Sequence, residues 1–251
     1  MESKDLIAQL ELAKDAARAS GKLLLKNKNQ LNKKLDDNLK DIKLKADIHS
    51  ESLIKEIINR ESSYPILAEE SGKSVKDLGE IFWVIDPLDG TANYNRGIPM
   101  CCVSIGLTKN MQPLLGVIYD FDNDHMYEGD VFNNCSMMNN DPIEVSNIQK
   151  KENGILITGL PHHMDFSDKS LSKMIKDMQT WKKVRMIGSA AIASCYIASG
   201  KAEKYQEKGV YLWDIIAGAA VVKSAGGKAE ITNVRENFQV DIIFSNSDIK
   251  D

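Results

Sequence analysis

The chain has 251 residues, of which 43% are hydrophobic, so it can bury a substantial core as one large domain or as two lobes. Its 32 Lys and Arg against 36 Asp and Glu give a net charge of -4, which excludes a global positive field that would recruit nucleic acid or an anionic membrane. Because no apolar run approaches the ~18 residues of a membrane span and the four cysteines lack CxxC spacing, we expect a cytoplasmic protein with reduced thiols.

Two helices are predicted in the first quarter of the chain. Ser3 is a residue type that caps helix N-termini, and the apolar residues after it share one face of a helix reaching about Leu25: Leu6, Ile7, Leu10, Ala13, Ala17 and Leu24. Residues 27–40 are polar and show no period, so we interpret them as an exposed loop. Asp47 opens a second helical pattern, which ends before Tyr64 and has an apolar stripe of Leu53, Ile54, Ile57 and Ile58.

The middle of the chain is predicted to form a β-sheet. A short strand leads into the acidic residues Glu69 and Glu70. Residues 81–85 are β-branched and aromatic, as in a buried strand, and Pro87 cannot donate to a sheet ladder, so we predict that this strand ends at Asp86. Further strands of the same sheet are predicted at residues 100–107, 114–119 and 126–128.

The last third of the chain alternates strands with helices. Strands are predicted at residues 154–158, 184–187, 202–206 and 241–245, and helices at residues 168–181, 189–199 and 214–225. This pattern is typical of a layered, mixed α/β fold in two lobes. Because no Pro- or Gly-rich linker separates them, we assign residues 1–145 and 146–251 to lobes that form a single compact unit.

Carboxylates gather at the ends of these predicted elements. Asp86 and Asp89 lie on either side of a turn that Gly90 permits, so both carboxylates can converge while the N–H groups of Gly90 and Thr91 face an anion. Two carboxylates in a partly dry site raise each other's pKa unless a cation intervenes. The natural cation is a hard, oxygen-preferring metal such as Mg²⁺.

Each of the other acidic groups has a simpler interpretation when it is taken singly. A carboxylate at a helix start, such as Asp47 or Asp214, is more often a cap than a ligand, and the acidic pair at Glu69 and Glu70 would most often be solvated. Trp213 beside Asp214, and the apolar segments before the other acids, instead indicate a pocket. Taken together, the three acidic groups favour a metal site.

One acidic run resembles a calcium loop but departs from it. Asp120, Asp122 and Asp124 match the first three ligand positions, whereas His125 stands where the loop needs Gly and Val131 where it needs Glu. We interpret this run as a hairpin turn. The four histidines have no zinc-site spacing, so a zinc enzyme is not expected.

Five motifs occur in the order that a known family has them, and they span nearly the whole chain. They are KADIHSE at residues 45–51, LAEES at 67–71, WVIDPLDGTANY at 83–94, IGSAA at 187–191 and WDIIAGAAVVKSAGG at 213–227. On these motifs the chain resembles the inositol monophosphatase family of Mg²⁺-dependent, Li⁺-sensitive phosphatases. The resemblance implies an αβαβα sandwich and a homodimer.

The resemblance also implies a role for particular residues. Glu69, Asp86 and the Leu88 carbonyl would hold one Mg²⁺, and Asp86, Asp89 and Asp214 a second, with Mn²⁺ as a possible substitute. A third, looser ion would share Glu69, which leaves Glu70 outside the ligand set. The catalytic residues would be Asp47 and Thr91, which orient and help deprotonate the attacking water, together with Glu69. The substrate would contact Asp89, Gly90, Thr91, Gly188, Ser189, Ala190, Glu207 and Asp214.

The expected activity is hydrolysis of a small phosphate monoester, either inositol monophosphate or a sugar phosphate, by a metal-activated water without a phosphoenzyme. A 3'(2'),5'-bisphosphate nucleotidase, a fructose-1,6-bisphosphatase and a non-catalytic metal-binding regulatory protein remain open as alternatives. The chain also departs from the family pattern. Ala92 stands where most relatives carry Thr, and Asp36 and Asp37 stand where a Lys is usual.

Overall fold

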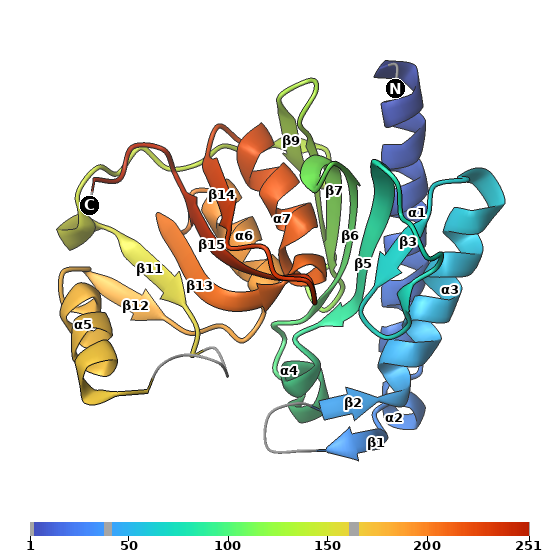
Figure 1. The fold of residues 1–251 in the computed structure, drawn as a ribbon, viewed down its shortest axis with the longest axis horizontal. Helices are drawn as coiled ribbons and strands as arrows, with labels where there is room; N and C mark the ends of the chain where they lie inside the picture. Colours follow the sequence, from blue (N-terminus) through green and yellow to red (C-terminus); the bar gives the residue numbers. More distant parts are fainter. Residues whose placement is uncertain (1–2, 38–41, 161–165, 251) are drawn as a thin grey trace.

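The computed structural model describes residues 3–37, 42–160 and 166–250, and it arranges them in five layers (Figure 1). In order, the layers are helices α1 (Ser3–Lys26) and α3 (Lys45–Glu61), an eight-stranded sheet, helices α6 (Ala190–Ala198) and α7 (Leu212–Ser224), a five-stranded sheet, and helix α5 (Asp168–Met178). This order confirms the αβαβα sandwich that the resemblance implies. No helix among the described residues is long and apolar enough to cross a membrane.

The eight-stranded sheet is antiparallel except where β3 lies parallel to β5. From one edge to the other its strands are β10 (Asp141–Pro142), β9 (Cys135–Met138), β8 (His125–Asp130), β7 (Gln112–Asp120), β6 (Cys102–Lys109), β5 (Ile81–Asp89), β3 (Ile66–Ala68) and β4 (Gly72–Lys73). The turn between β7 and β8 holds Asp122 and Asp124, so the interpretation of this acidic run as a hairpin is confirmed.

The five-stranded sheet mixes parallel and antiparallel pairs. Its order is β12 (Lys183–Arg185), β11 (Ile155–Thr158), β13 (Lys204–Tyr211), β15 (Gln239–Ser245) and β14 (Lys228–Thr232), and a short 3-10 helix, η1 (Lys151–Asn153), precedes β11. The pairs of β11 with β12 and β13 are parallel, and those of β15 with β13 and β14 are antiparallel. Sequence analysis missed β14, an edge strand in which the partly buried Ala229 and Ile231 alternate with exposed residues, although this alternation is typical of a half-buried strand. The lobe boundary near residue 145 stays a prediction.

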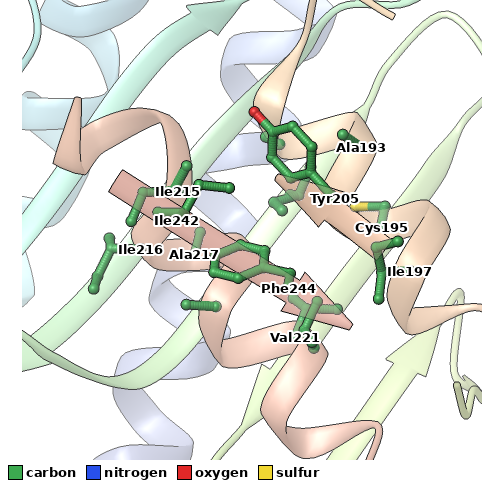
Figure 2. Close-up of a cluster of buried hydrophobic side chains, with 14 of the residues drawn as sticks. Ala193, Cys195, Ile197, Tyr205, Ile215, Ile216, Ala217, Val221, Ile242 and Phe244 are labelled. Atoms are coloured by element: carbon green, nitrogen blue, oxygen red, sulfur yellow. The ribbon is translucent and has the colours of Figure 1, made fainter. Parts of the chain in front are cut away.

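Helix α7 packs closely between the two sheets because the strands beneath it carry glycines. A Cβ atom at Gly116 of β7 would collide with the backbone of Ala217, and one at Gly129 of β8 would collide with the backbone of Val221. On its other side α7 meets Phe244 of β15 in a buried apolar cluster (Figure 2). The start of α7, which carries Asp214, is therefore fixed relative to both sheets.

Two local predictions were wrong. Strand β5 does not end at Asp86: its pairing with β6 shifts register after Asp86 and resumes at Asp89, so Pro87 is accommodated in a bulge that needs no N–H donor there. Ile7 does not share the buried face of α1, because its side chain is 51% exposed.

The segment interpreted as a loop at residues 27–40 is also partly ordered. It contains helix α2 (Lys28–Leu31) and strand β1 (Lys34–Asp37), which pairs antiparallel with β2 (Ile42–Leu44), while residues 38–41 lie outside the described part. Strand β2 leads directly into α3, which begins at Lys45 rather than Asp47. Strands this short leave no hydrophobic period to detect, since they depend on contacts with distant residues.

Candidate active site

A cavity of about 570 Å³ opens between the two halves of the molecule, where β5, β11 and β13 meet the starts of α4 (Thr91–Arg96), α6 and α7. The predicted site residues that line it are Glu69, Asp86, Leu88, Asp89, Gly90, Thr91, Gly188, Ser189, Ala190, Glu207 and Asp214. Of the predicted site residues only Asp47 does not line this cavity. Residues far apart in the sequence, from Glu69 to Asp214, thus meet at one cavity.

The corner between β5 and α4 brings the two aspartates into the cavity. The Asp86 carboxylate accepts a hydrogen bond from the Leu88 N–H at 2.9 Å, which closes a tight turn around Pro87. Gly90 has a φ of 86°, and a Cβ there would lie 2.7 Å from the Met100 carbonyl oxygen. Only glycine fits this position, so the corner is fixed by the sequence DPLDG.

Four carboxylates approach one another at this corner. The Glu69 N–H donates to the Ile85 carbonyl at 3.1 Å, which places Glu69 beside Asp86. Burial raises the pKa of Glu69 well above its usual value, and the charge of Asp214 adds to this effect. Burial likewise raises the pKa of Asp86, followed by the charges of Glu69, Asp89 and Asp214. The structure therefore brings together the four acidic side chains named as metal ligands.

Protein donors hold two of these carboxylates in place. Asp89 Oδ2 accepts from Ser189 Oγ at 2.5 Å and from the Ala191 N–H at 2.7 Å, which ties β5 to the start of α6. Asp214 Oδ2 accepts from the Tyr211 N–H at 2.8 Å, as the start of α7 requires. Both carboxylates are thus anchored by backbone donors as well as by their own strands and helices.

The donor set suits a hard divalent cation. In the part of the chain that the structure describes, no three acidic, cysteine or histidine side chains are oriented as a preformed metal cage. The candidate ligands are nevertheless all oxygen atoms, which hard cations prefer. A bound cation would also stabilise the ionised form of these buried carboxylates, whose pKa values are raised. The Leu88 carbonyl adds a neutral oxygen at the same corner, 3.0 Å from Thr91 Oγ1.

Asp47 reaches the site through Thr91. Its side chain is 1% exposed, and Asp47 Oδ1 lies 3.1 Å from Thr91 Oγ1 while Oδ2 accepts from the Leu44 N–H at 2.7 Å. Burial raises the pKa of Asp47 to about 7, against the opposing effect of the Leu44 N–H. The pairing of Asp47 with Thr91 that the resemblance implies is present, although Asp47 stands behind Thr91 rather than in the cavity.

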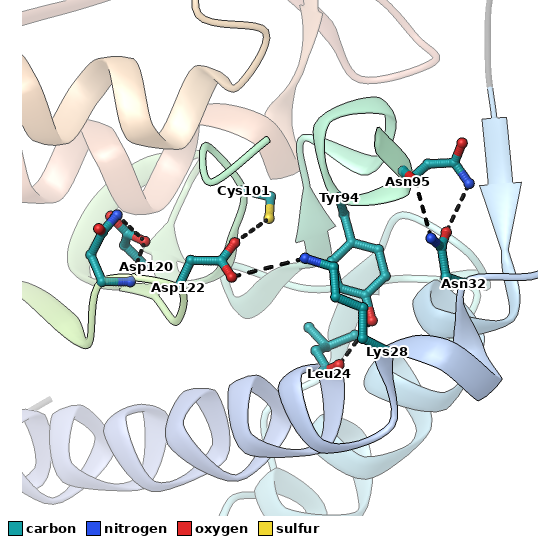
Figure 3. A network of polar contacts seen from close by, with 9 residues as sticks. Leu24, Lys28, Asn32, Tyr94, Asn95, Cys101, Asp120 and Asp122 are labelled. Atoms are coloured by element: carbon teal, nitrogen blue, oxygen red, sulfur yellow. Dashed lines mark hydrogen bonds and ion pairs between the residues drawn. The ribbon is translucent and has the colours of Figure 1, made fainter. Parts of the chain in front are cut away.

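Helix α4, which begins at Thr91, is anchored to the first helices of the chain (Figure 3). Tyr94 donates its hydroxyl to the Leu24 carbonyl at 2.8 Å. Asn32 and Asn95 exchange two hydrogen bonds, one from Asn32 Nδ2 to the Asn95 carbonyl at 3.1 Å and one from Asn95 Nδ2 to Asn32 Oδ1 at 2.7 Å. These contacts fix Thr91 against α1 and α2.

Glu207 of β13 also lines the cavity. Tyr205, two residues earlier on the same face of β13, donates its hydroxyl to Glu207 Oε2 at 2.9 Å. Burial raises the pKa of Glu207, and a Cβ at Gly159 would lie 2.6 Å from the Glu207 carboxylate. Tyr205 was missed by sequence analysis, because the strand was predicted to end before Glu207; extending its two-residue period would have found it.

Asn93 is a second residue that sequence analysis missed. Its Nδ2 donates to the Met100 carbonyl at 2.8 Å and to the Ile187 carbonyl at 3.0 Å, so it joins the loop after α4 to the loop before α6. Gly188, next in that loop, has a φ of 74°. The partners of Asn93 are far apart in the sequence, so no spacing could have indicated its role.

Glu70 does not line the cavity, and its carboxylate forms an ion pair with Lys43 on β2. The hydrogen bond that Lys43 donates to Glu70, with the nearby charges of Glu70, Asp47 and Glu51, raises the pKa of Lys43. This arrangement agrees with leaving Glu70 out of the ligand set. Ala92, which stands where most relatives carry Thr, also lines the cavity.

Comparisons with known proteins identify the family. Residues 6–246 match the model of the inositol monophosphatase family. An inositol-1-monophosphatase of Synechocystis is 33% identical over 228 residues, which is 89% of this chain and 78% of that protein. The Nus factor SuhB of Xylella fastidiosa is 34% identical over 219 residues, which is 84% of this chain and 78% of that protein.

A solved structure agrees with this assignment. The inositol monophosphatase from Anabaena (Nostoc) superposes with a TM-score of 0.83 at 33% identity, covering 97% of this chain and 92% of that one. The shared fold, the matched motifs and the cavity that gathers their acidic residues all lead to one conclusion. The chain belongs to the inositol monophosphatase family, and with it to the phosphoric monoester hydrolases.

Proposed function

We propose that this protein hydrolyses a small phosphate monoester, inositol monophosphate or a related sugar or polyol phosphate, in a Mg²⁺-dependent, Li⁺-sensitive reaction without a phosphoenzyme. One observation carries the proposal: four carboxylates line a single cavity together with Glu207, a hydroxyl acceptor. The Synechocystis relative is named as an inositol-1-monophosphatase. We further propose that the protein works as a cytoplasmic homodimer.

The acidic residues divide between the proposed metal ions. Glu69, Asp86 and the Leu88 carbonyl would hold one Mg²⁺, and Asp86, Asp89 and Asp214 a second, while a third would share Glu69; Mn²⁺ is a possible substitute. When bound, such ions lower the pKa of a water molecule and neutralise the charge that develops on the leaving oxygen. The chain itself supplies the orientation of water and substrate.

Thr91 and Asp47 act on the attacking water. Thr91 Oγ1 lies at the cavity wall and can accept a hydrogen bond from water when its own proton points to Asp47 Oδ1, 3.1 Å away. Asp47 Oδ2 accepts from the Leu44 N–H, and this bond holds the carboxylate with Oδ1 at Thr91. Asp47 therefore stabilises the arrangement in which Thr91 draws a proton from water.

Glu207 and the backbone around it bind the organic part of the substrate. Because Tyr205 donates to Glu207 Oε2, Oε1 remains available to a hydroxyl group of a sugar or cyclitol. Gly188, Ser189 and Ala190 line the same cavity and offer backbone groups to the substrate. On the phosphate side, the N–H groups of Gly90 and Thr91 would face the anion.

A second candidate function is regulatory. The Xylella relative is named as a Nus factor, so a non-catalytic role in a larger assembly is the alternative. The complete acidic set favours the enzyme, because a protein that had lost its activity would be expected to have lost at least one of these side chains. The two rivals within enzymes, a 3'(2'),5'-bisphosphate nucleotidase and a fructose-1,6-bisphosphatase, differ only in the substrate.

A panel of phosphate esters tests the proposal. Phosphate release from inositol monophosphate, a sugar monophosphate, fructose 1,6-bisphosphate and a 3',5'-bisphosphate nucleotide is measured in Mg²⁺, with and without Li⁺. We expect the highest kcat/KM with a monophosphate and inhibition by Li⁺. A preference for a bisphosphate would instead identify the protein as a bisphosphate nucleotidase or a fructose-1,6-bisphosphatase. If no phosphate is released from any ester, the regulatory role is favoured.

The Asp89→Asn variant tests the ligand assignment. The amide oxygen can still accept from Ser189 and Ala191, so the fold should be kept, whereas the charge at the cation site is lost. We expect kcat to fall by about 100-fold or more, on the order of 3 kcal/mol of transition-state stabilisation. Asp122→Asn, whose carboxylate faces Lys28 and Cys101 away from the cavity, is the control. Near wild-type phosphate release by Asp89→Asn would mean that Asp89 is not a ligand.

The Asp47→Asn variant separates water activation from metal binding. The amide can accept a hydrogen bond but cannot stabilise the Thr91 proton as a carboxylate does, so turnover should drop by about 10²- to 10⁴-fold. Binding of Mg²⁺, measured by calorimetry, should change much less, because Asp47 does not line the cavity. Parallel losses in turnover and in Mg²⁺ affinity would reject this role for Asp47.

The Tyr205→Phe variant tests the orientation of Glu207. Removing one hydrogen bond of about 1 kcal/mol should raise KM for a polyol phosphate roughly fivefold, since the Glu207 carboxylate is no longer held. The same variant should leave KM unchanged for p-nitrophenyl phosphate, which offers Glu207 no hydroxyl group. An equal change for both esters would show that Tyr205 acts on the fold rather than on substrate recognition.

A further inference from the structure

Lys43 connects the β1–β2 hairpin to the acidic corner at the end of β3. Its ammonium group pairs with the Glu70 carboxylate, and their side chains are 37% and 11% exposed. Glu70 directly follows Glu69, one of the four carboxylates at the cavity. This ion pair therefore joins β2, which contributes no cavity residue, to the end of β3, where Glu69 lines the cavity.

Glu70 is itself held against helix α3. Its N–H donates to Glu51 Oε2 at 2.9 Å, and Glu51 lies 3.7 Å from the Lys55 ammonium. Lys55 also donates to Ser71 Oγ at 2.9 Å. The backbone of Glu70 is thus held in place. Lys43 adds β2 to a network of two lysines and two glutamates rather than forming an isolated surface pair.

The residue after Lys43 controls Asp47. The Leu44 N–H donates to Asp47 Oδ2 at 2.7 Å, and this bond leaves Oδ1 directed at Thr91. Leu44 is the last residue of β2, so any shift of that strand moves the donor that orients Asp47. A route of direct contacts thus runs from Glu70 through Lys43 and Leu44 to the Asp47 carboxylate.

We propose that Lys43 is a positioning residue for the reaction: its ion pair with Glu70 fastens β2 to the corner that carries Glu69, and so holds the Leu44 N–H against Asp47. Lys43 touches neither substrate nor the reacting atoms. The charge lies on the outer side of the acidic corner, where it neutralises Glu70 without entering the cavity. This inference rests on the proposed function in one respect, namely that Asp47 acts on the attacking water.

The experiment follows the Leu44 amide directly, so that it does not depend on activity. Hydrogen exchange is measured by mass spectrometry on peptides containing Leu44, in the full-length protein, alongside kcat and KM with Mg²⁺. For Lys43→Met we expect exchange of this amide to be about three- to fivefold faster and kcat to be lower by a similar factor, with KM unchanged. The charge-swap double variant, Lys43→Glu with Glu70→Lys, should restore both the slow exchange of the Leu44 amide and kcat.

Lys45→Met is the matched control, since it removes an exposed lysine two residues along the chain. It should leave exchange at Leu44 and kcat unchanged. Wild-type exchange at Leu44 in Lys43→Met would overturn the proposal, and so would equal acceleration in Lys45→Met. If no ester is hydrolysed by the wild-type protein, the proposed function fails, but the exchange data still decide whether Lys43 holds β2 against Asp47.

Discussion

Mutual repulsion among buried carboxylates is the constraint around which this molecule is built. Glu69, Asp86, Asp89 and Asp214 share one cavity, and burial together with the neighbouring charges raises the pKa of Asp86 and Glu69. Such a cluster destabilises the folded state unless the backbone holds each acid in place and a cation neutralises it. The rest of the fold supplies the first of these conditions.

Rigid packing keeps the acids together. Helix α7 lies against glycines of the first sheet on one side and against Phe244 of the second sheet on the other (Figures 1 and 2). Asp214 stands in its first turn, and its position therefore follows from the largest apolar cluster of the protein. Asp89 is bonded to the start of α6, the partner helix in the same layer. The core thus offsets the repulsion that the site creates.

Sequence reasoning predicted the site better than the elements around it. The acidic residues at Asp86 and Asp89 could be found because Pro87 and Gly90 determine the turn locally. The β1–β2 hairpin and Asn93 could not be predicted in the same way. Asn93 contacts Met100 and Ile187, and β2 depends on Glu70, so their roles arise only when distant segments meet.

The negative charge of the cavity explains why its lining is acidic while the nearby Lys43 lies outside it. A phosphate anion would be repelled by four ionised carboxylates, so under the proposed function its binding would depend on cations held by these acids. Two divalent ions would balance four carboxylates and leave the phosphate to the N–H groups of Gly90 and Thr91. A lysine inside the cavity would compete with the cations for the same carboxylates. Lys43 instead neutralises Glu70 from outside, where its charge can hold β2 in place without weakening the metal site.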